Sequence, residues 1–149
     1  MATANQATSG LCPGGDRQVM RWVRVFPGVP EQVAVVRQFV GFLLHACPAR
    51  DDAVACASEL AANAVVHTAS GKGGLFSVEV VRHSGAVRVA VTDAGASTAP
   101  AVRVAHNDLD VLGESGLGLA LVAGRASVWG YAGTGSGRTV WAEIRWHAG

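Results

Sequence analysis

Residues 52–67 of the 149-residue chain read DAVACASELAANAVVH, and this stretch decides the fold. We expect a helix that opens at Asp51 or Asp52 and runs to about His67 or Thr68, before the glycine-rich residues 70–74 break it. The helix is apolar nearly all round, so most of its surface is expected to be buried. A few polar positions interrupt the apolar surface, and three of them are Glu59, Asn63 and His67.

The spacing of four residues places Glu59, Asn63 and His67 one turn apart on a single stripe of that helix. Such a stripe can face a ligand while the other faces are buried. A carboxylate and an amide one turn apart suit a magnesium-phosphate site, because oxygen ligands favour the hard cation and a carboxylate can act as a general base. The alternative is a solvated helix edge, with His67 favoured by the helix dipole at the last turn.

The segments around this helix predict a sheet and two further helices. Alternation over residues 20–26 predicts a strand, and apolar residues spaced by three and four over residues 33–44 predict a helix that ends at Cys47-Pro48. The remaining predicted elements are strands over 76–82 and 87–92, a helix over 118–126, and strands over 127–131 and 138–146. Helices grouped apart from a mostly antiparallel sheet indicate an α+β two-layer sandwich with the helices on one face.

Composition is typical of one cytoplasmic domain. Half of the residues are hydrophobic and 15% are charged, which is enough for a continuous core over residues 19–149. Residues 1–18 are small and polar, and we expect them to form a disordered tail. The net charge of +1 provides no basic excess for binding nucleic acid or a membrane surface. Neither a secretory signal nor a membrane span is expected, and Cys12, Cys47 and Cys56 have the spacing of neither a disulfide framework nor a zinc site.

Residues 89–95 read VAVTDAG, so an apolar strand ends in Asp93 and Gly95. A buried carboxylate can accept a hydrogen bond from the exocyclic amine of an adenine, and a glycine lets a ligand approach the backbone closely. An ordinary turn is the alternative, because Asp and Gly are favoured there. Periodicity is then lost over residues 93–115, and we expect this long loop to cover a ligand as a lid.

Two further glycine-rich segments extend the candidate site. Residues 113–122 read GESGLGLALV, so Gly116 and Gly118 lead into a helix start whose free N–H groups favour phosphate oxygens. Residues 135–141 read GSGRTVW, where Thr139 can lend a hydroxyl beside Asp93 if the two strands are neighbours. A flexible cap explains the first segment equally well, and a β-branched strand residue explains Thr139 equally well.

In this order, the four segments resemble the histidine-kinase-like ATPase family, which has the Bergerat nucleotide fold. Glu59-Leu60-x-x-Asn63-Ala64-x-x-His67 is similar to its N box, and Asp93-x-Gly95 is similar to its first glycine box. The resemblance covers about residues 19–146 and includes the second glycine box and the closing strand. It implies that ATP is bound with Mg²⁺ on Asn63, that Glu59 is the catalytic base and that Asp93 reads the adenine amine. The full set of nucleotide-binding residues that it implies is Asn63, His67, Asp93, Gly95, Gly116, Leu117, Gly118, Leu119 and Thr139.

Within this family, the short lid and the Trp129-Gly130 pair resemble those of the small anti-sigma-factor serine kinases of bacteria such as actinobacteria. This likeness implies a protein that binds a sigma factor, phosphorylates a serine on an anti-anti-sigma partner of the STAS type, and so switches partners. Members of the branch often dimerise, so a homodimer is a further expectation.

Other interpretations remain beside this one. Ala96 and Ser97 stand where the first glycine box often has its second glycine, and Leu117 stands where this branch commonly has arginine. Both departures favour a non-catalytic protein-binding module of the same fold. The catalytic part of a two-component sensor is disfavoured, because no histidine has the setting of a phosphoaccepting helical hairpin; the five are His45, His67, His83, His106 and His147.

Overall fold

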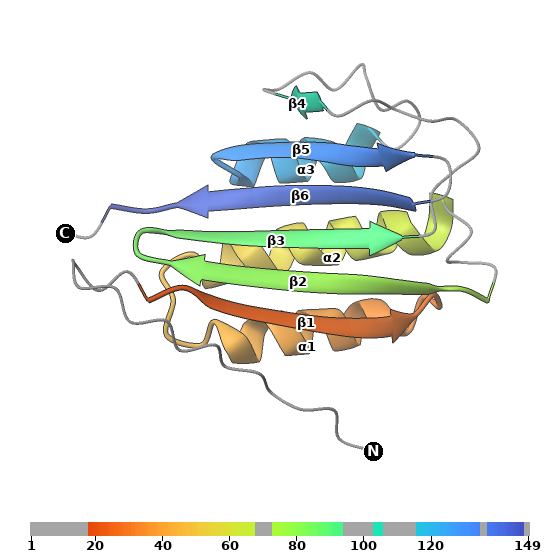
Figure 1. Ribbon diagram of the computed structural model, residues 1–149, viewed down its shortest axis with the longest axis horizontal. Coiled ribbons are helices and arrows are strands. Elements are labelled where there is room, and N and C mark those ends of the chain that lie inside the picture. Colours follow the sequence, from red (N-terminus) through yellow and green to blue (C-terminus); the bar gives the residue numbers. More distant parts are fainter. Residues whose placement is uncertain (1–17, 68–72, 94–102, 106–115, 135–136, 148–149) are drawn as a thin grey trace.

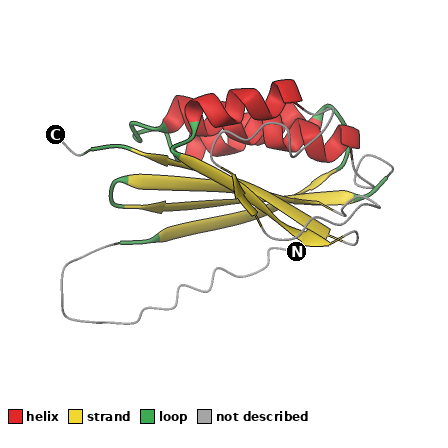
Figure 2. Ribbon diagram, turned by 90° about the horizontal axis from the view of Figure 1, so that it is seen from above, coloured by secondary structure: helices red, strands yellow, loops and turns green. Residues whose placement is uncertain are grey.

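An antiparallel six-stranded sheet forms one layer of the molecule, and helices cover one of its faces (Figures 1 and 2). The computed structural model describes residues 18–67, 73–93, 103–105, 116–134 and 137–147. The strand order is β1-β2-β3-β6-β5-β4, and every neighbouring pair is antiparallel. The predicted α+β two-layer sandwich is therefore confirmed. Its elements are β1 (Met20–Pro27), α1 (Gln32–Leu43), α2 (Arg50–His67), β2 (Leu75–His83), β3 (Ala86–Asp93), β4 (Arg103–Ala105), α3 (Gly116–Arg125), β5 (Val128–Thr134) and β6 (Gly137–Arg145).

Alternation along the strands sends one set of side chains toward the helices. Val78 on β2 pairs with Val91 on β3, which pairs with Val140 on β6, and all three are buried. Because side chains alternate in a strand, the residues between them face the open side of the sheet. There the guanidinium carbon of Arg88 lies 4.1 Å from the ring centroid of Trp141.

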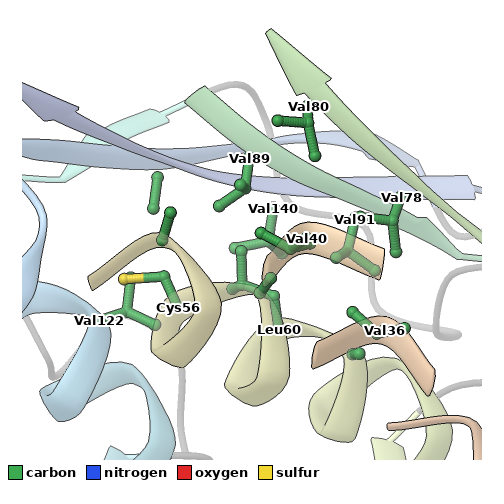
Figure 3. Close-up of a cluster of buried hydrophobic side chains, with 14 of the residues drawn as sticks. Val36, Val40, Cys56, Leu60, Val78, Val80, Val89, Val91, Val122 and Val140 are labelled. Atoms are coloured by element: carbon green, nitrogen blue, oxygen red, sulfur yellow. The ribbon is translucent and has the colours of Figure 1, made fainter. Parts of the chain in front are cut away.

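Helix α2 lies at the centre of the helical layer, packed on β3 and flanked by α1 and α3. Figure 3 shows Leu60 and Cys56 of α2 among the valines of the sheet and of the neighbouring helices. Leu60 is only 2% exposed, and Ala53, Ala57 and Ala61 on the same helix are not exposed at all. Small side chains let α2 approach the sheet closely, which explains its alanine-rich sequence.

Two expectations about the second half of the chain need correction. Residues 93–115 are not one continuous loop, because strand β4 lies within them and pairs with β5. A three-residue strand is too short to show a period of two, so its sequence carried no signal. Helix α3 also begins two residues earlier than expected, at Gly116. Residues 1–17 of the predicted tail and most of the predicted lid lie outside the described residues.

Among the described residues, no helix is both long enough and apolar enough to cross a bilayer.

Candidate nucleotide-binding site

The contacts of α2 show which neighbour each of its faces meets. On one side, Arg37 of α1 donates to the hydroxyl of Ser58 at 3.1 Å. On the other side, Arg125 of α3 donates to the carboxylate of Asp52 at 2.9 Å. The face that carries Asp52 is therefore the face toward α3.

Glu59 and Asn63 share this face. They follow Asp52 by seven and eleven residues, and at 3.6 residues per turn both lie within about 20° of it around the helix axis. Both residues are partly exposed, unlike the alanines that face the sheet. The predicted stripe therefore runs along the boundary between α2 and α3. His67 is the last residue of α2, at the end of the same helix.

The ion pair between Asp52 and Arg125 also shows the direction of α3. It joins the start of α2 to the end of α3, and the two helices pack together, so they run antiparallel. Gly116 lies nine residues before Arg125, or about 14 Å along the axis. The first turn of α3 is consequently level with the part of α2 that carries Glu59 and Asn63.

Asp93 approaches this region from the sheet. It ends β3, alternates with Val91, and therefore faces the helices. It is only 7% exposed and is the one buried charged side chain among the described residues. Figure 1 shows that β3 ends, β6 begins and α2 ends at the same edge of the molecule. A buried carboxylate, a helix N-terminus and the Asn63 end of α2 are thus brought to one side of the fold.

The structure does not bring the hydroxyl of Thr139 beside the carboxylate of Asp93. The two strands are neighbours, but Thr139 pairs with Thr92, and their hydroxyl oxygens lie 2.7 Å apart. Both threonines therefore occupy the open face of the sheet, opposite to the side chain of Asp93. The residue paired with Asp93 is Arg138. Sequence reasoning missed Arg138, because its face follows from the burial of Val140, and in the sequence Trp141 is an equally apolar candidate for the buried face.

The remaining predicted site residues fall into three groups. Leu119 is 4% exposed and belongs to the hydrophobic core. Gly116, Leu117 and Gly118 form the first turn of α3, as the predicted phosphate-binding helix start requires. Gly95 lies outside the described residues.

Cys56 lies on the α3 side of α2, between Asp52 and Glu59. Burial raises the pKa of its thiol from 9.0 to about 12, and the negative charges of Asp52 and Glu59 add to this rise while Arg125 opposes it. The thiol is therefore a neutral core group and no nucleophile.

Metal ligands are sparse in this region. The described part of the chain holds no group of three histidine, cysteine, aspartate or glutamate side chains that could bind a metal ion. The oxygen donors on the α3 side of α2 include the carboxylate of Glu59 and the amide of Asn63, and proteins usually hold Mg²⁺ through one or two such oxygens together with waters and phosphates.

The sequence pattern of the histidine kinase-like ATPase domain matches residues 26–144, which includes α2, the end of β3, α3 and β6. The chain belongs to the histidine kinase-like ATPase domain family. No curated protein matches it. Membership in this family implies an ATP-binding domain, and the buried carboxylate and helix start at one edge of the sheet fit a purine nucleotide.

Proposed function

We propose that this histidine kinase-like ATPase domain binds Mg²⁺-ATP and transfers phosphate to a serine of an anti-anti-sigma partner. The observation that supports it most is the position of Asp93, a buried carboxylate at the edge of the sheet where α2 ends. A buried carboxylate at this edge can accept a hydrogen bond from the exocyclic amine of a purine, and carboxylates in such settings are common in functional sites.

Each end of the nucleotide has its own residues in this proposal. Asp93 accepts a hydrogen bond from the exocyclic amine of adenine. The backbone N–H groups at Gly116 and Gly118 donate to phosphate oxygens, where the helix dipole also favours negative charge. Asn63 holds Mg²⁺ through its amide oxygen, because it lies on the α3 side of α2, level with the start of α3.

Glu59 is the proposed general base. It lies one turn before Asn63 on the same face of α2 and is partly exposed, so an incoming serine hydroxyl can reach it. Its carboxylate accepts the hydroxyl proton as the serine oxygen attacks. When bound, ATP supplies the γ-phosphoryl group. The bond from its phosphorus to the oxygen bridging the β- and γ-phosphates breaks, a bond to the serine oxygen forms, and ADP is the leaving group.

The partners follow from the likeness of the sequence to the anti-sigma-factor branch. We propose that the unmodified anti-anti-sigma protein and the sigma factor compete for the domain, so that phosphorylation of the former frees the domain for the latter. A homodimer and a cytoplasmic location belong to the same proposal.

Calorimetric titration with Mg²⁺-ATP tests the nucleotide site. We expect micromolar binding by the wild-type protein and none by Asp93→Ala or Asn63→Ala. Thr92→Val and Gln38→Ala are matched controls, because Thr92 faces the open side of the sheet and Gln38 is exposed on α1. Absence of binding by the wild-type protein would overturn the kinase proposal.

Phosphate transfer needs a separate assay. Purified anti-anti-sigma proteins of the STAS type from the same organism are incubated with the domain and γ-labelled ATP. Glu59→Gln should retain ATP binding but lose transfer by about 100-fold or more, the usual contribution of a general base. ATP binding by the wild-type protein with no transfer to any of these proteins would instead favour the non-catalytic module.

A further inference from the structure

A buried donor without an acceptor lies beside Asp93. Within the described part of the chain, two buried side-chain atoms have no hydrogen-bond partner, Nε1 of Trp129 and Nε of Arg138. Trp129 pairs with Ala142 in the interior of the sheet, whereas Arg138 is at the edge where Asp93 lies. Leaving a buried N–H unpaired is costly, and more so when the group is charged, so the Nε of Arg138 calls for an acceptor.

The neighbours of Arg138 across the sheet define where that acceptor can come from. Arg138 pairs with Asp93 on β3 and with Gly133 on β5. Paired residues in an antiparallel sheet share a face, so the guanidinium and the carboxylate both point to the helix side, with Cβ atoms about 5 Å apart. Gly133 has no side chain, which leaves the other flank of Arg138 without a side-chain acceptor.

A carboxylate beside a guanidinium presents an acceptor next to a donor. Adenine has the matching pattern, because its exocyclic amine donates while the ring nitrogens N1 and N7, on either side of it, accept. Guanine has a carbonyl oxygen in place of that amine, and this oxygen would face the carboxylate of Asp93.

We propose that Arg138 is a nucleotide-binding residue that donates from its guanidinium to a ring nitrogen beside the adenine amine. The inference rests on the proposed ATP site and adds a second base contact to it. Asp93 and Arg138 together then hold adenine by its amine and the neighbouring ring nitrogen, whereas guanine in the same pose would place its carbonyl oxygen against the carboxylate of Asp93.

Deaza analogues of ATP test the contact atom by atom. ATP, 7-deaza-ATP and 1-deaza-ATP are titrated into the wild-type protein, Arg138→Met and Arg138→Lys, with Asp93→Ala as the reference for loss of the site. Arg145→Gln is the matched control, because Arg145 is exposed at the far end of the same strand. Thermal unfolding of each variant reports whether it folds.

We expect Arg138→Met to bind ATP about tenfold more weakly, the size of one charge-assisted hydrogen bond. The wild-type protein should bind one of the two analogues about tenfold more weakly than ATP, and which one identifies the nitrogen. Arg138→Met should no longer distinguish that analogue from ATP. Arg138→Lys keeps the positive charge opposite Asp93 but lacks Nε, so its affinity for ATP should lie between those of the wild-type protein and Arg138→Met. This variant tests the contact if Arg138→Met fails to fold.

Two results would overturn the inference while leaving the proposed function intact. In one, Arg138→Met binds ATP as tightly as the wild-type protein while Asp93→Ala does not bind. In the other, Arg138→Met binds ATP weakly but still discriminates against the same analogue as the wild-type protein. Failure of the wild-type protein to bind ATP would instead overturn the proposed function, and this inference with it.

Discussion

Arg125, the last residue of α3, and Asp52, near the start of α2, form an ion pair with 2.9 Å between nitrogen and oxygen. Both side chains are 45% exposed. This pair marks the antiparallel packing that brings the start of α3 level with Glu59 and Asn63.

Because the pair is so exposed, we expect it to report the packing more than to cause it. Arg125→Gln should lower the free energy of unfolding by less than about 1 kcal/mol, and by less still at high salt. Urea unfolding at two salt concentrations measures this, with Arg145→Gln as a control for another exposed arginine that pairs with a glutamate. A loss above about 2 kcal/mol would mean that the ion pair, more than the apolar contact, holds α3 in place.

The hydroxyls of Thr92 and Thr139 lie on the open face of the sheet, so Thr139→Val should leave the affinity for Mg²⁺-ATP within about twofold of wild type. Thr92→Val and Thr139→Val should each cost about 0.5 to 1 kcal/mol of stability, whereas the double variant should cost less than the sum. Calorimetry and a double-mutant cycle check both expectations. Loss of ATP binding in Thr139→Val would place its hydroxyl in the site after all.

Leu60 faces the sheet from the middle of α2 and is 2% exposed, whereas Val66 on the same helix is 70% exposed. Leu60→Ala should therefore lower the free energy of unfolding by about 2 to 5 kcal/mol, because it leaves a cavity under the sheet. Val66→Ala should change it by less than about 0.5 kcal/mol. Urea unfolding measures both, and equal losses would contradict the assignment of the buried face.

The sequence was sufficient to predict the elements in which apolar or polar residues recur at a regular spacing. Apolar spacing predicted α1, and in α2 the spacing of four put Glu59 and Asn63 on one stripe, which the contacts of Asp52 place toward α3. The face of a residue on β6 was harder to predict, because it depends on the register of β6 against β3. A slip of one residue exchanges the faces, so nothing in the sequence of residues 137–141 tells Arg138 from Thr139 as the partner of Asp93.

Cys56 makes the stability of the domain depend on alkaline pH. Its thiol has a pKa of about 12 in the fold against an ordinary value of 9.0, so the folded protein holds this proton more tightly than the unfolded chain. The resulting stabilisation is complete below pH 9.0 and is lost as the pH rises through about 12. Cys56→Ala lacks the thiol, so the stability advantage of the wild-type protein over this variant should shrink above pH 9.0.

Urea unfolding of the two proteins at several pH values, with a reducing agent present, measures this difference. The comparison with Cys56→Ala cancels the titration of other groups, which both proteins share. A difference that stays constant from neutral pH to about 12 would contradict the raised pKa.

Gly133 and Gly124 should respond in opposite directions to the same substitution. Gly133 has a φ of +135°, and a Cβ atom there would lie 2.2 Å from the carbonyl oxygen of Gly137. Because this contact is with backbone, Gly133→Ala must displace the β5–β6 pairing beside Arg138, and we expect a loss of at least about 2 kcal/mol. Gly124 lies within α3 with nothing within 4 Å of an added Cβ, so Gly124→Ala should raise stability by about 0.5 to 1 kcal/mol.

Thermal and urea unfolding of the two variants check these signs. Weak ATP binding by Gly133→Ala, measured at a temperature where the variant is still folded, would also agree with a nucleotide site that depends on the position of Arg138 at the start of β6. A Gly133→Ala variant as stable as the wild-type protein would mean that the strands rearrange without cost, and that the pairing of Arg138 with Asp93 does not depend on the backbone conformation of Gly133.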